Sequence, residues 1–264
     1  MAGLLQHKSQ IFLRNSINGL FRERFGDSCQ DLESLKNKFV GNKCFILGNG
    51  PSLAHVPNRL LEKEFTFGTN GIFLKHTPNV YVSISPDYYN QHFDKIKEVS
   101  SPFKFFGAHL WDENRFVPGG NYLQCNWNIY GHLLGFKFPV PFKFSLRPDR
   151  VLFLGGTVLF VCLQIAHWMG FKKVYLLGVD HKFGFPRAEA TYGGRRIGRG
   201  EANSIHFIDS YSKSEYNPHC DPIATERAFE LASKVFCKTG GRLINATPDT
   251  ALDVLPKTSI DRLI

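Results

Sequence analysis

The chain has 264 residues, of which 43% are hydrophobic and 21% are charged, a composition that excludes intrinsic disorder and a fibrous protein. It carries 32 Lys and Arg against 23 Asp and Glu, and the resulting formal charge of +9 indicates an anionic partner. Three partners fit that charge: a nucleic acid, an acidic membrane face or a phosphorylated substrate.

The cysteines and the apolar runs predict the cellular compartment of the protein. The six cysteines form no C-x-x-C pair and no zinc-finger spacing, which favours a reducing compartment. We see no signal peptide and no uncharged apolar run of about 18 residues, so we expect a cytoplasmic protein without a membrane span.

Residues 1–38 form the first predicted element, an N-terminal amphipathic helical segment. Apolar residues recur at helical spacing, with basic side chains between or beyond them at Lys8, Arg14, Arg22 and Arg24. One interpretation is a helix that docks on the core. The other is a helix that binds a partner or lies peripherally on the inner face of the membrane.

Strands and helices are then predicted to alternate. Residues 43–47 predict a buried strand that runs into the turn GNGPSL, and 57–64 a helix or turn. Further strands are expected in 65–74, 79–85 and 103–110, in the clear strand 172–180 and in 242–245. Helices are expected over 157–170, ended by Gly170, and over 224–239. Residues 111–150 look like an irregular insertion, and 181–220 a polar, Gly-rich lid loop.

This alternation predicts an α/β fold of the Rossmann-like, three-layer kind, with a mostly parallel sheet and a nucleotide-binding catalytic domain over residues 39–264. Ligands of such sheets bind beyond the carboxyl ends of the strands. The polar residues that follow the strands should therefore converge, and they are Gly48 to Ser52, Asn70, Asp87, Asp180 with His181, and Asn245 to Thr247.

The turn GNGPSL is the first candidate binding element. Gly48 and Gly50 let the backbone approach a ligand, and free N–H groups there would cradle phosphate. Pro51 would fix the turn and Ser52 would cap the next helix. The turn is neither G-x-G-x-x-G nor a Walker A loop, and its alternative is an ordinary strand-to-helix connection.

Three further polar residues each have a functional and a structural interpretation. Asn70 would hydrogen-bond a base or sugar, or is a turn Asn before Gly71. Asp87 would orient a hydroxyl or hold a metal, or caps a helix. Asp180 ends a central strand, where a carboxylate favours function.

The acid/base candidates lie in and beside the predicted lid. They are His181, His206, Asp209 and Tyr211. Each of these residues alone could be structural or part of the surface. Nearby arginines would fold over a phosphorylated ligand or form a solvated surface, and they are Arg187, Arg195, Arg196 and Arg199. No helix-turn-helix, zinc-finger or RRM pattern accompanies them, so we expect no nucleic-acid partner.

The order of several motifs resembles the MptE-like domain family, named for an archaeal 6-hydroxymethylpterin diphosphokinase. The motifs GNGPSL, FGTNGIFL, LLGVDHKF, IHFIDSY and GGRLINATP carry this resemblance over roughly residues 40–260. Many bacterial members of that family look like products of surface-glycan gene clusters.

The layout is also similar to bacterial lipooligosaccharide sialyltransferases, which have a Rossmann-like fold and use CMP-sialic acid. That resemblance implies nucleotide contacts at Asn49, Gly50, Pro51, Ser52 and Asn70, with Thr157 approximately aligned. Those enzymes have a catalytic His in a segment like H-Y-x-x-H-S-K. In residues 206–213 of this chain that His is absent, Tyr211 or Asp209 occupies its neighbourhood, and His206 could act as the base from a shifted position.

We therefore expect a glycosyltransferase that uses a nucleotide-activated sugar, CMP-linked by resemblance, in bacterial surface polysaccharide assembly. Its partners would be the nucleotide-sugar donor and a glycan or lipid-linked acceptor, and it would require no cofactor. His206 or Asp209 would deprotonate the acceptor, and Lys213 or the lid arginines would offset phosphate charge.

Two alternatives remain open. In a pyrophosphokinase of the MptE type, Asp87 and Asp180 would hold Mg²⁺ for diphosphate transfer from ATP. In a scaffold that has lost its catalytic His, a nucleotide or glycan would bind without turnover.

Overall fold

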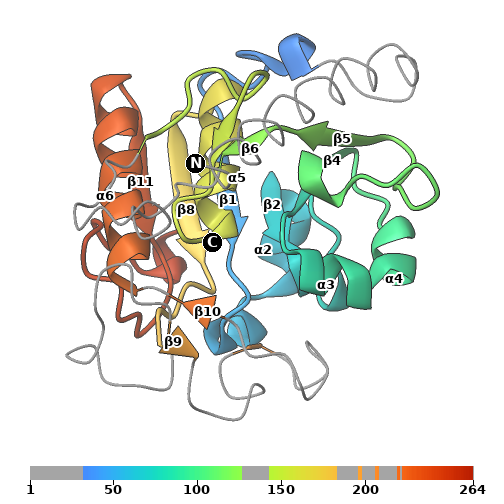
Figure 1. The fold of residues 1–264 in the computed structure, drawn as a ribbon. Coiled ribbons are helices and arrows are strands. Elements are labelled where there is room, and N and C mark those ends of the chain that lie inside the picture. The colour runs from blue at the N-terminus through green and yellow to red at the C-terminus, as the bar shows by residue number, and fades with distance from the viewer. Residues whose placement is uncertain are drawn as a thin grey trace.

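The computed structural model describes residues 32–126, 143–182, 196–197, 206–207, 219–220 and 222–263 (Figure 1). Most of the predicted N-terminal helical segment and most of the predicted lid therefore lie outside the described residues. Within 32–38, the structure has only a short 3₁₀ helix, η1 (Leu32–Leu35), followed by a turn.

Seven parallel strands form the main sheet of the described part of the chain, in the order β11-β8-β1-β2-β3-β4-β5. They are β1 (Lys43–Leu47), β2 (Thr66–Thr69), β3 (Val80–Ser83), β4 (Phe103–Gly107), β5 (Gly120–Leu123), β8 (Lys173–Leu177) and β11 (Arg242–Asn245). Two small pairs are separate from it, β6 (Cys125–Asn126) parallel to β7 (Leu152–Phe153) and β9 (Arg196–Ile197) antiparallel to β10 (His219–Cys220).

Helices cover both faces of this sheet, which confirms the predicted three-layer α/β arrangement. The side chains of β1 alternate, so that Cys44 and Ile46 belong to one buried cluster, and Phe45 and Leu47 to the other. The first face is covered by α5 (Val158–Trp168) and α6 (Pro222–Lys238), and the second by α2 (Asn58–Lys63), α3 (Pro86–Gln91) and α4 (Phe93–Lys97). In Figure 1, α6 stands on the left and α2 to α4 lie together on the right.

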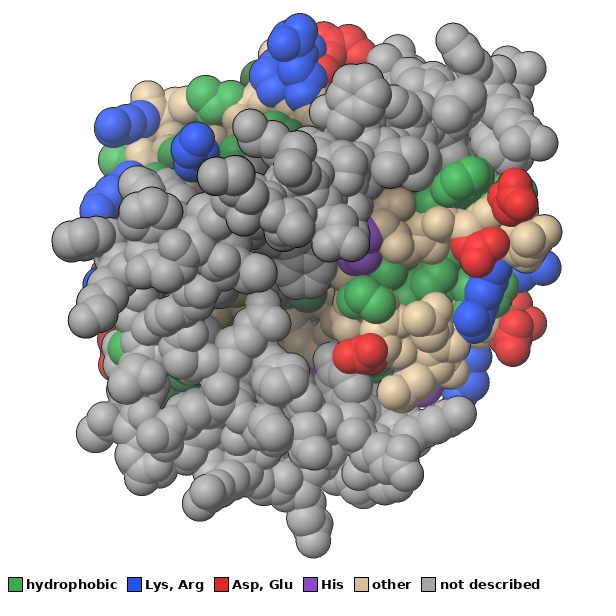
Figure 2. Space-filling model, in the orientation of Figure 1, with side chains coloured by type: hydrophobic (Ala, Val, Ile, Leu, Met, Phe, Trp, Pro, Cys, Tyr) green, Lys and Arg blue, Asp and Glu red, His purple; other side chains and the backbone are tan. Residues whose placement is uncertain are grey.

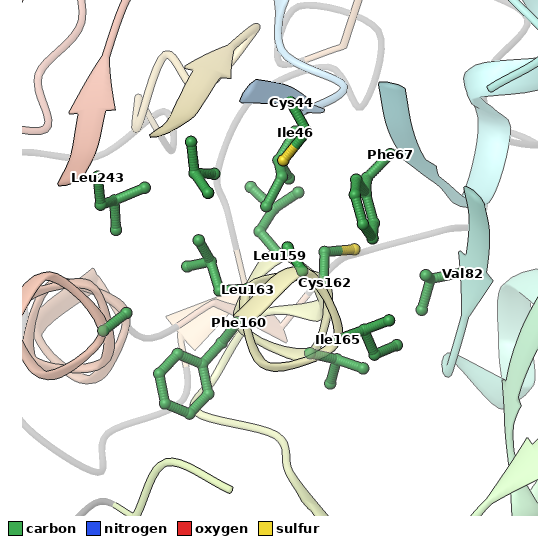
Figure 3. Close-up of a cluster of buried hydrophobic side chains, with 14 of the residues drawn as sticks. Cys44, Ile46, Phe67, Val82, Leu159, Phe160, Cys162, Leu163, Ile165 and Leu243 are labelled. Atoms are coloured by element: carbon green, nitrogen blue, oxygen red, sulfur yellow. The ribbon is translucent and has the colours of Figure 1, made fainter. Parts of the chain in front are cut away.

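The core under the first face is built around α5 (Figure 3). Cys162 and Leu163 of α5 are fully buried, as are Cys44 and Ile46 of β1 and Phe67 of β2. Burial raises the pKa of the Cys44 thiol well above its ordinary value, so this residue packs as a small neutral hydrophobe. No helix in the described residues has the length and hydrophobicity that a membrane span requires.

The predicted irregular insertion over 111–150 is wrong in part, because it contains β5, the edge strand of the main sheet. Its sequence, Gly-Asn-Tyr-Leu, begins with two residues that are rare in strands, and an edge position tolerates them. Tyr122 supplies the packing, with its ring stacked 5.2 Å from that of Phe106 in β4. Residues 127–142 lie outside the described residues.

Short 3₁₀ helices follow the carboxyl ends of three strands. The turn after β1 continues into η2 (Pro51–His55), and β2 leads into η3 (Asn70–Leu74). After β4 comes η4 (Ala108–Leu110), and the chain closes with η9 (Ile260–Arg262).

Candidate functional site

The strand order reverses beside β1, where a parallel sheet forms its ligand crevice. Strands β2 to β5 follow on one side of β1, whereas β8 and β11 lie on its other side. Beyond the carboxyl ends of β1 and β8 lie Gly48 to Ser52 and Gly178 to His181. This is the position at which open α/β sheets bind ligands.

Two backbone hydrogen bonds attach the turn after β1 to the end of β8. Gly48 N–H donates to the Leu177 carbonyl over 2.7 Å, and Gly50 N–H donates to the Gly178 carbonyl over 2.9 Å. A Cβ on Gly48 would lie 2.4 Å from the Gly178 oxygen, so only glycine allows this approach. The expectation that these two N–H groups are free for phosphate is therefore wrong, because they already have backbone acceptors.

The side chain of Asp180, just after β8, adds further hydrogen bonds to the same turn. Its carboxylate accepts from the Ser52 N–H over 3.2 and 3.3 Å and from the Ser52 hydroxyl over 2.8 Å. A Cβ on Gly50 would lie 2.1 Å from Asp180 Oδ2. The buried carboxylate thus accepts from donors that a phosphate would need, and a catalytic role of Asp180 stays a prediction.

Ser52 is consequently not the helix cap that the sequence predicts. The helix η2 begins at Pro51, its N-cap is Gly50, and no side chain caps it. The Ser52 hydroxyl donates to Asp180 instead, which leaves its lone pairs as acceptors toward a ligand.

The end of β8 is also held from the β11 side. Val179 N–H donates to the Thr247 hydroxyl over 3.0 Å, and the Thr250 hydroxyl donates to the Val179 carbonyl over 2.7 Å. Ala251 N–H donates to the Asp180 carbonyl over 2.9 Å. The predicted convergence of Asn245 to Thr247 on this edge is confirmed. The sequence analysis did not identify Thr250 as a contact of β8. The sequence hint for it is the pair of threonines in ATPDT, residues 246–250.

His181 lies in the left-handed region, with φ +57°. Its Nε2 lies 3.1 Å from Glu226 Oε1, and the His181 side chain is only 3% exposed. This contact joins the end of β8 to the first turns of α6. No sequence pattern indicates Glu226 as the partner of His181.

On the β2 side, Asn49 and Asn70 lie on adjoining turns. Asn49 Nδ2 donates to the Thr69 carbonyl over 3.0 Å and to the Thr69 hydroxyl over 3.1 Å. Asn70 has φ +46°, its carbonyl accepts from Tyr81 over 2.8 Å, and its Oδ1 accepts from Ser83 over 3.3 Å. The Asn70 carbonyl oxygen is thus engaged, and its Nδ2 is the group that would donate to a base or sugar.

His206 lies against the same turn. Phe207 N–H donates to the Asn49 carbonyl over 3.0 Å, and His206 Nδ1 lies 3.4 Å from that oxygen. Since a carbonyl only accepts, a hydrogen bond here has Nδ1 as its donor, which makes the buried Nε2 atom the acceptor of the neutral ring. Burial lowers the pKa of His206 to about 4, opposed by the bond to Asn49, so the ring is neutral at pH 7. The structure thus places His206, Asn49 and the Ser52–Asp180 pair along the same turn after β1.

Asp87 is not part of this group. It is exposed in the first turn of α3, which Ser85 caps by accepting from Tyr88 N–H over 3.4 Å. Asp87 follows β3, which lies three strand positions from β8, or about 14 Å at ~4.8 Å per strand. A single Mg²⁺ binds its oxygens at about 2 Å, so Asp87 and Asp180 do not make one metal site as the pyrophosphokinase alternative supposed.

Of the remaining predicted residues, Thr157 is described and most of the others lie outside the described residues. Thr157 caps α5 by accepting from Leu159 N–H over 3.3 Å. Beside it, a Cβ on Gly156 would lie 3.5 Å from the Ala224 side chain at the start of α6. Asp209, Tyr211 and Lys213 lie outside the described residues, as do the lid arginines except the backbone of Arg196 in β9. The described residues contain no group of three His, Cys, Asp or Glu suited to a metal ion.

Comparison with known proteins gives one family match. The model of the family described as 6-hydroxymethylpterin diphosphokinase MptE-like matches residues 22–185, well over half of the chain. The matched region includes the turn after β1 and Asp180, and it ends before His206. A search of curated proteins finds no match.

Two similar solved structures are of the sialyltransferase CstII from Campylobacter jejuni. One is in complex with a substrate analogue, cytidine-5′-monophosphate; it is 17% identical, has a TM-score of 0.46 and covers 83% of this chain and 86% of that chain. The other is in complex with CMP-3FNeuAc; it is 18% identical, has a TM-score of 0.40 and covers 82% of this chain and 85% of that chain.

Proposed function

Because the chain belongs to the MptE-like family, we propose that it is a transferase that moves a group from a nucleotide-activated donor to an acceptor hydroxyl. The group that we propose is a sugar, carried by a nucleotide such as CMP and destined for a surface glycan. The observation that supports this proposal is the neutral His206 ring beside the Asn49 carbonyl, at the turn after β1 where the strand order reverses.

The proposed reaction uses His206 as the general base. Nε2 takes the proton from the acceptor hydroxyl while the oxygen forms a bond to the anomeric carbon, and the nucleotide leaves with the electron pair of the broken C–O bond. A base with a pKa of about 4 is weak, but a bound donor places negative phosphate nearby, which raises that pKa toward neutrality.

The nucleotide itself would lie against the half-buried outer surface of the turn. Asn49, Pro51 and the Ser52 oxygen face that side of the crevice in this proposal, and Asn70 Nδ2 would donate to the base or the sugar. The lid arginines and Lys213 stay predictions as groups that offset phosphate charge. In this proposal Asp180 acts indirectly, by accepting from the Ser52 N–H and hydroxyl and so orienting the Ser52 oxygen.

The test is the variant His206→Ala. We expect transfer from a panel of CMP-, UDP- and GDP-sugars to fall by at least 100-fold, the usual contribution of a general base, while nucleotide affinity changes little. His55→Ala is the matched control, because His55 is exposed in η2 near the same turn. Transfer by His206→Ala at the rate of His55→Ala would refute the assignment of the base.

The family description favours one second candidate, a diphosphokinase that transfers diphosphate from ATP to a hydroxymethyl group. Thermal unfolding with CMP, UDP, GDP and ATP, each with and without Mg²⁺, separates the two functions. Binding to the native state stabilises it by about 2.7 kcal/mol at 100 times Kd. A shift that needs ATP and Mg²⁺ together supports the diphosphokinase, and a shift with CMP alone supports the sugar transferase. Tight nucleotide binding without turnover of any donor would indicate a scaffold.

A further inference from the structure

The edge of the sheet opposite the site carries a row of basic residues. Because all seven strands are parallel, they begin at one edge, and β11, β8 and β1 begin with Arg242, Lys173 and Lys43. The register pairs Arg242 with Lys173 and Lys173 with Lys43. Neighbouring strands are about 4.8 Å apart, so these cations stand side by side across three strands.

The last turns of α5 and α6 extend this row. Lys36 Nζ lies 4.9 Å above the Trp168 ring at the end of α5, and the Arg147 guanidinium lies 5.8 Å from it. Lys172 Nζ donates to the Thr239 carbonyl just beyond α6 over 2.7 Å. We name the set the amino-edge surface, and its basic members are Lys36, Lys38, Lys43, Arg147, Lys172, Lys173, Lys238 and Arg242.

Much of this charge is not neutralised within the protein. Three of the cations form ion pairs, Lys36 with Glu33, Lys43 with Glu64 and Arg147 with Asp149. The other five have no ion pair with a described residue. Four of these five are exposed, and they are Lys38, Lys173, Lys238 and Arg242. In Figure 2, several Lys and Arg side chains lie along the upper and upper left edge, with an acidic side chain beside them at the top, while acidic and basic side chains alternate on the right.

The same edge exposes aliphatic side chains. Val40 and Leu146 are 60% and 58% exposed, and they are the exposed large hydrophobic residues of the described chain. Both lie in segments joined to Trp168: Asn37 N–H donates to its carbonyl over 2.9 Å, and Arg147 lies over its ring. Two aliphatic groups thus project from a surface rich in cations.

We propose that the amino-edge surface docks on an anionic lipid bilayer. The cations would contact lipid phosphates, and the two aliphatic side chains would enter the boundary with the acyl chains. A nucleic acid would use the charge but not the aliphatic groups, which makes it the less suitable occupant.

The place at which the N-terminal stretch joins the fold also supports an anionic bilayer as the binding partner of this surface. Trp168 Nε1 donates to the Leu32 carbonyl over 2.9 Å, so the chain before Leu32 joins the protein at this edge. That stretch of sequence contains Lys8, Arg14, Arg22 and Arg24 among apolar residues at helical spacing.

The experiment measures co-sedimentation of the full-length chain with vesicles. Vesicles of equal parts phosphatidylglycerol and phosphatidylcholine are compared with vesicles of pure phosphatidylcholine. The test variant combines Lys173→Gln, Lys238→Gln and Arg242→Gln. The control variant combines Arg59→Gln, Lys182→Gln and Arg227→Gln, which removes the same charge from exposed positions near the opposite edge.

Each lysine or arginine near an anionic membrane contributes roughly fivefold to binding, so the test variant should lose roughly 100-fold and the control much less. A second variant, Val40→Ser with Leu146→Ser, should bind the anionic vesicles more weakly than the wild type. The difference should be clearest at high salt, where the attraction between charges is screened. Equal losses in the two charge variants, or wild-type binding by the test variant, would overturn the proposal. So would undiminished binding to phosphatidylcholine, or release from the vesicles by polyuridylate RNA at equal phosphate concentration.

Discussion

His206 shows how one backbone contact sets the chemistry of a side chain. The Asn49 carbonyl accepts from Nδ1, which assigns the acceptor role to Nε2, and burial keeps the ring neutral with a pKa of about 4. The sequence identifies a histidine in the predicted lid but shows neither its tautomer nor its pKa. The tautomer depends on a carbonyl 157 residues away, and the pKa is lowered by burial, which the bond to that carbonyl opposes.

This lowered pKa gives a testable pH dependence of stability. Between the unfolded pKa of about 6.5 and the folded pKa of about 4, the unfolded chain binds the proton more tightly. The contribution of neutral His206 is therefore complete above pH 6.5 and is lost as the pH falls toward 4, by on the order of 3 kcal/mol.

Urea unfolding of the wild type and of His206→Gln at pH 7 and pH 4.5 measures this contribution. His76 and His167, whose pKa values burial also lowers, are present in both proteins and cancel in the comparison. The variant should lose less stability than the wild type on acidification. Parallel losses in the two proteins would show that His206 does not resist protonation.

Asp180 makes a second prediction at the same scale. Asp180→Asn replaces one carboxylate oxygen with an amide donor, which faces the N–H and hydroxyl of Ser52. We expect a loss of about 1–3 kcal/mol in the free energy of unfolding, the usual cost of breaking buried hydrogen bonds to a charged group. Asp253→Asn is the control, because Asp253 is exposed and pairs only at the surface with Lys257. Similar unfolding curves for the two variants would contradict a stabilising role for the hydrogen bonds between Asp180 and Ser52.

At the scale of elements, α5 depends on one polar residue inside an apolar helix. Gln164 is fully buried, and its Oε1 accepts from the N–H groups of Ser145 and Phe153, each over 3.0 Å. Its Nε2 donates to the carbonyls of Phe153 and Phe160 over 2.7 and 2.9 Å. One side chain thus attaches β7 and the segment before it to the helix.

Replacing this residue should be costly although the substitute is apolar. Gln164→Leu leaves the N–H groups of Ser145 and Phe153 without their acceptor, at about 1–3 kcal/mol for each buried group. Gln91→Leu, at an exposed position at the end of α3, should change the free energy of unfolding little. Thermal or urea unfolding of the two variants checks this, and equal stabilities would count against the role of Gln164.

Local sequence patterns predicted the elements whose signals are local. The apolar run 43–47 coincides with β1, and the strand expected in 172–180 contains β8. Strand β5 was missed because Gly120 and Asn121 interrupt the pattern, and its place in the sheet depends on pairing with β4. The glycines of the turn after β1 were recognised, but their main role is contact with β8, which only the tertiary structure shows.

At the scale of the whole molecule, strand order decided which candidates meet. The rule that ligands bind at the carboxyl edge does not say where along it, because the edge of seven strands is roughly 29 Å wide. Asp87 and Asp180 share that edge without sharing a site. The position of β8 beside β1 follows from a crossover of more than a hundred residues, which no short motif encodes.

The common direction of the strands has a geometric consequence for the two proposals together. The amino-edge surface and His206 belong to opposite ends of the sheet, about 17 Å apart along a five-residue strand, before the loops are added. A protein anchored by that surface would hold its crevice away from the bilayer, facing the aqueous side. The distance from the bilayer would then select the acceptor. A lipid whose hydroxyl lies at headgroup level would not reach the site, whereas a lipid extended by several sugar units would.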